Sequence, residues 1–338
     1  MAPYELAPDE LTALLAPDGI SPRSASPSSD SSTAAVVVVD PHELPSERTT
    51  RLRLHEGLPL IVVGLDTTSS SSSPGTYPFG PWCDLIARPD EMDRIEHWAS
   101  IRPVASLTLA LLLRGSEERS LDEGLLVESA TYSTLQAGAE FGAWLRSETK
   151  PGPAADPGPP VKVERDDHTL SISLSRSHRA NALDVSMREQ LLEALGIAIH
   201  DPSITEVVLR GEGAHYSTGG DLGEFGTFTD PATAHIIRLQ TSIGRAIHHL
   251  ADRITVHLHG TCAGSGIELP AFAGDLVAAS DVAISLPELA IGLVPGAGGT
   301  VSLPRRIGRH RTAWLALTGE RIGLHTALEW GLVDRPHH

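Results

Sequence analysis

The sequence has few of the residues on which several common protein classes depend. Its 338 residues include only two cysteines, Cys83 and Cys262, which lie far apart in the chain, so neither a disulfide framework nor a cysteine zinc site is expected. No apolar run approaches the roughly 18 residues that cross a bilayer. The first ten residues, MAPYELAPDE, carry acids where a secretory signal carries basic residues. We therefore expect a cytoplasmic protein with no membrane partner.

Positive charge is also scarce. The chain has 26 Lys and Arg against 43 Asp and Glu, which gives a formal net charge of −17 at pH 7. Such a chain repels polyanions at long range, so nucleic acid is not expected as a partner, although a local basic patch could bind one phosphorylated small molecule. The hydrophobic content of 41% is typical of a globular protein, and the length favours two domains.

A proline-rich segment divides the chain. Residues 151–160, PGPAADPGPP, contain five prolines and two glycines, and they favour an extended linker between residues 1–150 and 161–338. The first part has three short β-branched or apolar runs followed by helical spacing from about residue 90 to 147. In the second part strands alternate with helices, including a long helix predicted over roughly residues 232–250. This alternation predicts an α/β fold with parallel pairing.

Two glycine-rich turns and two acids mark a candidate site. In CAGSGIEL, small residues 264–266 follow a strand and precede a helix that carries Glu268, so backbone amides there can approach a ligand. A similar turn, STGGDL, lies about 45 positions earlier, and the two turns can direct two amides at one oxygen. A second acid, Glu288, follows Glu268 by 20 positions among apolar residues. Apolar surroundings raise carboxyl pKa values, which suits proton transfer near neutral pH.

Three better-known motifs do not fit these turns. A dinucleotide-binding G-x-G-x-x-G would need glycine at position 269, where Leu269 stands. A nucleophile elbow would need glycine at positions 263 and 267, which are Ala263 and Ile267. No Gly-Lys-Ser/Thr follows any glycine-rich turn, which excludes a P-loop.

Five segments, in order and spacing, resemble the crotonase (enoyl-CoA hydratase/isomerase) superfamily. They span about residues 161–334 and read RSHRANALDVSM, STGGDL, HGTCAGSGIEL, LPELAIGLVPGAGGT and LTGERIGLHTALEWGLVD. The resemblance implies the α/β crotonase fold, also called ClpP-like, built of stacked ββα units in residues 161–338. It also implies an acyl-CoA thioester as substrate, with coenzyme A arriving as part of that substrate and no metal or resident cofactor.

The resemblance assigns chemical roles to four residues. The backbone N–H groups of Gly220 and Ser265 would form an oxyanion hole for the thioester carbonyl and for the enolate formed at Cα. Glu268 and Glu288 match the two catalytic glutamates of the hydratases, which hold a water between them. One assists its attack at Cβ while a proton is delivered to Cα. The presence of both acids favours hydration of a 2-enoyl-CoA.

The remaining implied contacts with substrate or CoA flank these groups. They are Arg179, Ala180, Asn181, Thr218, Gly219, Asp221, Leu222, Gly264, Pro287 and Gly296. Two of them have a second explanation: Arg179 is equally well explained by solvent exposure, and Asp221 by capping of the next helix. Enoyl-CoA isomerisation and other enolate chemistry, such as decarboxylation or hydrolysis, stay open. So does a non-catalytic acyl-CoA-binding subunit.

The first part of the chain resembles the same family more weakly. The run from Arg102 to Ser147, which contains LDEGLLVESATY, is similar to the family's C-terminal helical segment, whereas the core after the linker stops at Asp334, where those helices should begin. We therefore expect residues 1–150 to be a smaller, degenerate crotonase-like α/β region. Residues of about 100–148 would supply the missing helices from the front. The family's habit of forming trimers or hexamers predicts a homo-oligomer.

Overall fold

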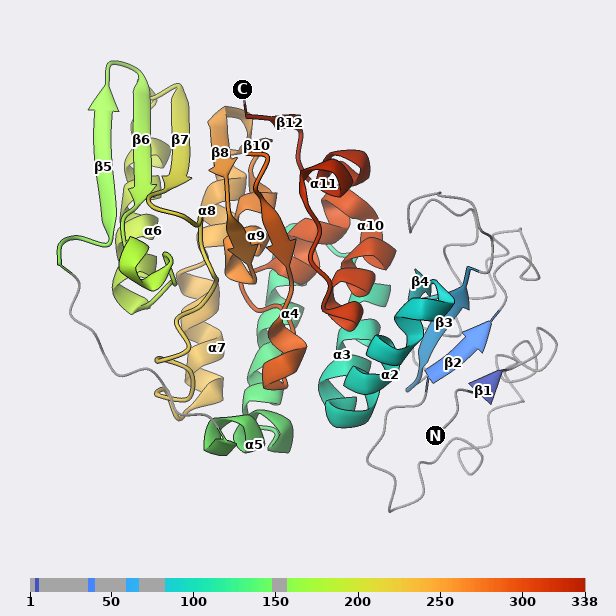
Figure 1. Ribbon diagram of the computed structural model, residues 1–338. Coiled ribbons are helices and arrows are strands. Elements are labelled where there is room, and N and C mark those ends of the chain that lie inside the picture. The colour runs from blue at the N-terminus through green and yellow to red at the C-terminus, as the bar shows by residue number, and fades with distance from the viewer. Residues whose placement is uncertain (1–3, 6–35, 40–58, 67–82, 148–156, 338) are drawn as a thin grey trace.

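The computed structural model of the chain describes residues 4–5, 36–39, 59–66, 83–147 and 157–337 (Figure 1). Residues 151–156 of the predicted linker lie outside this described part. Strands and helices alternate through residues 157–337, which confirms the predicted mixed α/β fold.

The central sheet of the larger part has six strands in the spatial order β12-β10-β8-β7-β6-β5. Neighbouring strands pair in parallel, except for the antiparallel hairpin of β5 and β6. The sequence did not predict β5, because it is an edge strand in which only Val161 is buried and the apolar pattern is correspondingly weak. The strands are β5 (Val161–Asp166), β6 (Thr169–Leu174), β7 (Glu206–Gly211), β8 (Ile254–Leu258), β10 (Asp275–Ala278) and β12 (Arg335–Pro336).

Helices cover one face of this sheet, as Figure 1 shows. Alternate residues of β7, Val207 and Leu209, are buried, as are Ile254 and Val256 of β8, so these positions supply the core beneath the helices. The sheet packs against α6 (Val185–His200), which contacts β5 and β6. Within the described ranges, no helix combines the length and apolar character that crossing a membrane requires.

The long helix predicted over residues 232–250 is wrong in one respect, because the structure has two helices there. They are α7 (Pro231–Gln240) and α8 (Ile243–His249). Ser242 separates them: its backbone is extended, and its Oγ accepts a hydrogen bond from Arg245 N at 3.2 Å. A serine that caps the second helix ends the first, and hydrophobic periodicity alone does not detect such a break.

A second, two-stranded parallel sheet leads into the candidate site. It pairs β9 (Thr261–Ala263) with β11 (Ala283–Ser285). The short helix α9 (Ser265–Glu268) follows β9, and the 3-10 turn η6 (Glu288–Ile291) follows β11. Because the strands are parallel, both segments begin at the same edge of the small sheet.

The N-terminal residues form a four-stranded parallel sheet followed by four helices. The sheet has the order β1 (Tyr4–Glu5), β2 (Val36–Val39), β3 (Ile61–Leu65) and β4 (Leu85–Ala87). The three β-branched or apolar runs of the sequence correspond to β2, β3 and β4. The helices are α2 (Met92–Ile101), α3 (Pro103–Arg114), α4 (Leu121–Gln136) and α5 (Ala139–Ser147).

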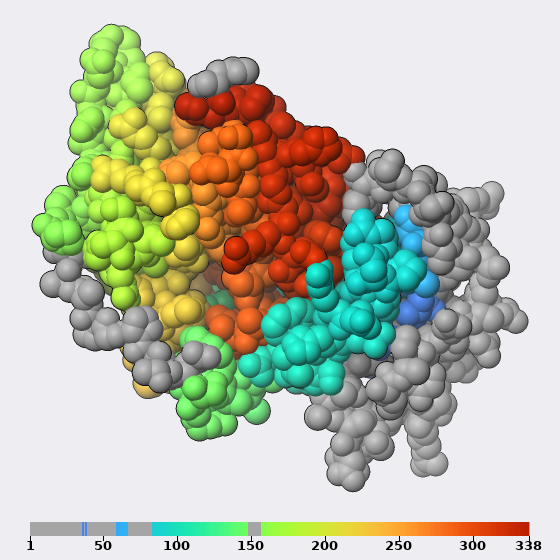
Figure 2. All heavy atoms as spheres, viewed as in Figure 1, coloured from blue at the N-terminus to red at the C-terminus, as the bar shows by residue number. Residues whose placement is uncertain are grey.

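These N-terminal helices pack directly on the larger part. Helices α2, α3 and α4 contact α10 (Gly299–Thr318), which precedes α11 (Leu324–Trp330), and α4 also contacts α7. Figure 2 shows the cyan surface of α2 and α3 against the red C-terminal segment. Trp314 Nε1 donates to Glu91 at 3.1 Å, and Ser133 Oγ donates to Pro231 O at 2.7 Å. Buried side chains of both regions form one hydrophobic cluster.

A glycine of α4 lies directly against α10. A Cβ atom at Gly124 would lie 2.9 Å from Val301 Cγ2, which is too close for a branched side chain to accommodate easily. Gly196 in α6 is also a helical glycine, but a Cβ atom there would meet nothing within 4 Å, so it serves as the control for Gly124.

We predict opposite effects of alanine at these two helical glycines. Gly196→Ala should raise the free energy of unfolding by about 0.5–1 kcal/mol through helix propensity. Gly124→Ala should lower it by about 1 kcal/mol, because overpacking against Val301 outweighs the same propensity gain. Urea denaturation measures both values. On a Val301→Ala background the penalty of Gly124→Ala should largely disappear, and a penalty that persists would contradict the packing of α4 on α10.

Candidate active site

Two glycine-rich turns lie against each other at the start of α9. Ser217 joins them: its backbone N–H donates to Thr261 O at 3.3 Å, and its carbonyl accepts from Ala263 N at 3.1 Å. Gly219 has a φ of 93°, and a Cβ atom there would lie 2.7 Å from Ala263 O and 3.6 Å from Ser265 N. Any other residue at position 219 would therefore strain the backbone and push the two turns apart.

The amides of Gly220 and Ser265 are both available to a ligand. Leu183 bonds the backbone on either side of Gly220, since Leu183 N donates to Gly219 O at 2.7 Å and Asp221 N donates to Leu183 O at 3.1 Å. Ser265 begins α9, so its N–H has no carbonyl one turn earlier to bind. Neither amide donates a hydrogen bond to any residue that the structure describes.

The two predicted acids converge beside the second turn. A Cβ atom at Gly264 would lie 2.5 Å from Glu288 Oε1 and 3.9 Å from Glu268 Oε1. The other oxygen of Glu268, Oε2, accepts hydrogen bonds from Ala297 N at 2.8 Å and Gly299 N at 2.9 Å. Both carboxyl groups therefore meet at the residue that precedes the Ser265 amide, and Gly264 leaves room for them.

Burial and mutual repulsion perturb both acids. Burial raises the pKa of Glu268 to about 7. The amides of Ala297 and Gly299 act in the opposite direction, because their hydrogen bonds favour the ionised form. Burial and then the charge of Glu268 raise the pKa of Glu288 well above its ordinary value. The contact between the two side chains acts in opposite directions, because it lowers the pKa of Glu268 and raises that of Glu288. Two carboxyl groups with raised pKa values thus stand side by side, and they titrate as a coupled pair.

Two further polar atoms at this place are buried. Ser265 Oγ and Glu288 Oε2 have no hydrogen-bond partner among the described residues. Buried polar atoms usually have a partner, so these two atoms favour contact with a bound ligand or water.

Several predicted binding residues instead hold the first turn in place. Ala180 and Asn181 have φ values of 50° and 53°, and Ala180 O accepts from Thr218 N at 3.1 Å. Asn181 Nδ2 donates to Glu212 O and His215 O, both at 2.9 Å. The side chain of Asn181 therefore ties the loop before the turn, rather than pointing outward as a substrate contact would.

Asp221 and Arg179 form part of an ion-pair cluster. Asp221 accepts from Arg176 Nη1 at 3.0 Å and from Arg179 Nη2 at 3.2 Å, and its Oδ1 accepts from Gly223 N at 2.9 Å. Burial opposes ionisation of Asp221, but the Gly223 N–H and the two guanidinium groups outweigh it and hold its pKa below its ordinary value. The carboxylate of Asp221 therefore binds two guanidinium groups and the Gly223 N–H, and Arg179 is held in this cluster with its side chain 21% exposed.

Four residues remain of those predicted to contact the substrate or CoA: three are exposed, and one is covered by an aromatic ring. Thr218, Leu222 and Pro287 are exposed, and only Pro287 directly adjoins a catalytic candidate, Glu288. Gly296 lies under an aromatic ring, since a Cβ atom there would overlap Tyr132.

Sequence reasoning missed two side chains that α4 brings to this place. The first is Glu128, which is buried and accepts hydrogen bonds from the start of α10. The second is Tyr132, whose pKa is raised chiefly by burial and also by the charges of Glu268 and Glu288. The signal was present, because Glu128 interrupts the apolar stripe formed by Leu125, Tyr132 and their neighbours at helical spacing.

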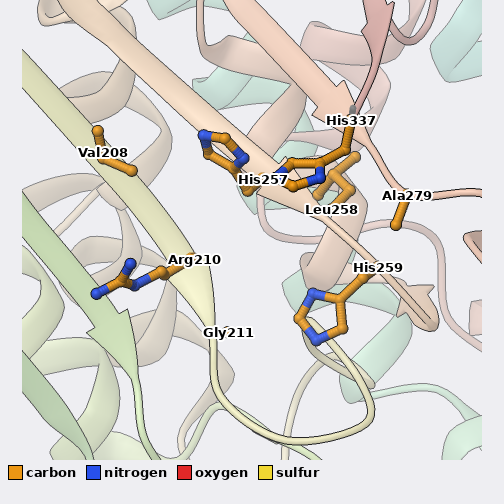
Figure 3. Close-up of a pocket in the computed structure, with 8 residues that line it drawn as sticks. All are labelled: Val208, Arg210, Gly211, His257, Leu258, His259, Ala279 and His337. Carbon is orange, nitrogen blue, oxygen red and sulfur yellow. The ribbon is translucent and has the colours of Figure 1, made fainter.

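A separate hollow of about 310 Å³ lies away from the carboxylates. Figure 3 shows its lining side chains on β7, β8 and the segments beyond β8 and β12, with the Arg210 and histidine side chains toward the uncovered face of the sheet. It contains none of the predicted site residues; its lining is Val208, Arg210, Gly211, His257, Leu258, His259, Ala279 and His337. Across the described ranges, no group of three or more His, Cys, Asp or Glu side chains is arranged to hold a metal ion.

Comparisons with known proteins match the larger part of the chain. The family model described as enoyl-CoA hydratase/isomerase matches residues 164–336. The 2,3-dehydroadipyl-CoA hydratase of Escherichia coli (strain K12) is 31% identical over 172 residues, which are 51% of this chain and 67% of that protein. The 4-chlorobenzoyl coenzyme A dehalogenase-2 of Arthrobacter sp is 32% identical over 180 residues, 52% of this chain and 65% of that protein.

Among solved structures, the enoyl-CoA hydratase of Thermoplasma volcanium GSS1 is 32% identical with a TM-score of 0.49, over 53% of this chain and 72% of that one. This chain spans about two thirds of the length of the curated relatives it matches.

The buried carboxyl pair predicts that stability falls as pH rises. An acid whose pKa is raised on folding binds more protons in the folded than in the unfolded state. Its contribution to the free energy of unfolding is therefore complete below about pH 4.5, and this contribution is lost as the pH rises through the folded pKa. Between pH 5.5 and 7.5 the free energy of unfolding should fall by at least about 2 kcal/mol more in the wild type than in the Glu268→Gln/Glu288→Gln variant, because each raised acid contributes up to about 1.4 kcal/mol per pH unit. Urea denaturation at several pH values measures this, and equal slopes would contradict the raised pKa values.

Proposed function

The chain belongs to the enoyl-CoA hydratase/isomerase family, and on that basis we propose that it hydrates a 2-enoyl-CoA thioester through an enolate intermediate. The observation that carries the proposal is the convergence of Glu268 and Glu288 at Gly264, directly before the amide of Ser265.

The two turns would bind the thioester oxygen. The unpaired amides of Gly220 and Ser265 supply two donors from adjoining turns, which is the arrangement needed to stabilise negative charge on that oxygen. Donors fixed in this way typically contribute several kcal/mol to stabilisation of an enolate-like transition state. The Ser265 hydroxyl, buried at the same place, offers a further polar contact to the acyl group.

The directions of the pKa shifts support a different role for each carboxyl group. Glu268, with a pKa of about 7, is ionised in a large fraction of molecules at neutral pH. It would therefore act as the base that takes the proton from water as that water attacks Cβ. Glu288 has the more strongly raised pKa and would deliver its proton to Cα. Protonated Glu288 and ionised Glu268 together are the state that hydration requires.

Sequence identity alone does not choose between reactions. The relative named as a hydratase and the one named as a dehalogenase are 31% and 32% identical to this chain. What favours hydration is the pair of acids, because a reaction that only moves a proton needs one base, whereas adding water requires a base for the water and an acid for Cα.

The proposal predicts turnover of crotonyl-CoA with loss of its conjugated absorbance. Glu268→Gln and Glu288→Gln should each lower kcat by about 10²–10⁴-fold, because each removes one proton-transfer group. Absorbance decay in buffered water measures the rate, and ¹⁸O-labelled water should place its label in the product.

Glu189→Gln serves as the matched control, since Glu189 is an exposed glutamate of α6. It should behave like the wild type. Conversion of a 3-enoyl-CoA to the conjugated isomer without uptake of water would instead assign the site to isomerisation. Binding without turnover, unaffected by either substitution, would assign it to a non-catalytic acyl-CoA-binding subunit.

A further inference from the structure

A third buried carboxylate binds the same turn as Glu268. Glu128 belongs to α4, which precedes the segment 164–336 matched by the family, and the residue is 2% exposed. Its Oε1 accepts from Gly298 N at 2.6 Å, and its Oε2 accepts from Thr300 N at 2.8 Å and from Thr300 Oγ1 at 2.7 Å. All three donors belong to the turn that begins α10.

Four successive amides alternate between the two acids. Ala297 N and Gly299 N donate to Glu268, whereas Gly298 N and Thr300 N donate to Glu128. The turn is thus fixed from both sides, and the φ of 104° at Gly298 permits the required backbone. Without Glu128, three buried donors would lose their acceptors, and only Glu268 would hold the amides of the turn through side-chain hydrogen bonds.

We propose that Glu128 is a positioning residue of the active site. By fixing the amides of Gly298 and Thr300, it holds the neighbouring amides on Glu268 Oε2 and so keeps Glu268 Oε1 directed at Gly264. The catalytic consequence rests on the function proposed above for Glu268. An acid from α4, outside the matched family segment, therefore completes the catalytic arrangement.

The charge of Glu128 also acts on the catalytic pair. The charged or titratable groups around it are Glu268 of α9, Glu288 of η6, Arg238 of α7 and Tyr132 of its own helix. Burial, followed by the charge of Glu268, raises the pKa of Glu128 to about 8. Once ionised, Glu128 raises the pKa of Glu288 further.

Glu128→Gln in the full chain tests both effects. At pH 6.5 kcat for crotonyl-CoA should fall about 10- to 100-fold, because a small displacement of a reacting group has costs of this size. KM should change by less than about threefold, since Glu128 is not placed to contact substrate. The alkaline limb of the kcat profile should move to lower pH, because Glu288 loses a neighbouring negative charge.

Thr300→Val separates geometry from charge. It removes one of the three hydrogen bonds to Glu128 and leaves the carboxylate in place. The variant should lower kcat by less than Glu128→Gln does and leave the alkaline limb where it is. Glu189→Gln again serves as the exposed-glutamate control. If Glu128→Gln does not fold, a wild-type kcat in Thr300→Val would overturn the positioning role.

A titration independent of turnover distinguishes this proposal from the proposed function. With glutamate labelled at the side-chain carbonyl carbon, NMR follows Glu288, whose signal is assigned by its loss in Glu288→Gln. The Glu288 pKa should be lower in Glu128→Gln than in the wild type. An unchanged pKa, with kcat also unchanged, overturns the role of Glu128. If the wild type hydrates no thioester, the proposed function fails, and a lowered Glu288 pKa would still support the electrostatic link.

Discussion

The arrangement of the site follows from the cost of burying two glutamates, Glu268 and Glu128, beside a third, Glu288. A buried carboxylate is expensive unless hydrogen bonds replace its water, and the start of α10 supplies them through four successive amides. The same amides fix where Glu268 can point. Because these hydrogen bonds offset only part of the cost of burial, the pKa values of Glu268 and Glu128 stay raised to about 7 and about 8. The proposed proton transfer near neutral pH depends on this incomplete compensation.

Glycine makes this crowding possible. Gly264 leaves room for the oxygens of Glu268 and Glu288, and Gly219 allows the backbone of the first turn to touch the second. A side chain at either position would separate groups that act together. The same reasoning applies to Gly296, whose missing side chain makes room for Tyr132. The small residues of the sequence motifs are therefore explained by close approach as well as by conformational freedom.

Much of this could be predicted from the sequence, and the exceptions have physical reasons. Most strands after residue 160, the two turns and the spacing of the two acids depend on local pattern, and the mixed α/β fold was predicted correctly. The edge strand β5 was missed because only one of its residues is buried. The break between α7 and α8 was missed because one serine cap decides it. Glu128 was missed because its partners lie about 170 positions away, and only tertiary packing brings them together. For Asn181 and Asp221 the family resemblance implied ligand contacts, and what the structure adds is a set of hydrogen bonds that stabilise the loop.

The central claim is that the amides of Gly220 and Ser265 stabilise an enolate of an acyl-CoA. Acetoacetyl-CoA tests it directly, because its enolate has an ultraviolet band that the keto form lacks. The compound is titrated into the protein at a pH where the free thioester is in its keto form. The account predicts that a saturable enolate band appears on binding. Saturable binding without that band would contradict the oxyanion hole on which the proposed chemistry depends.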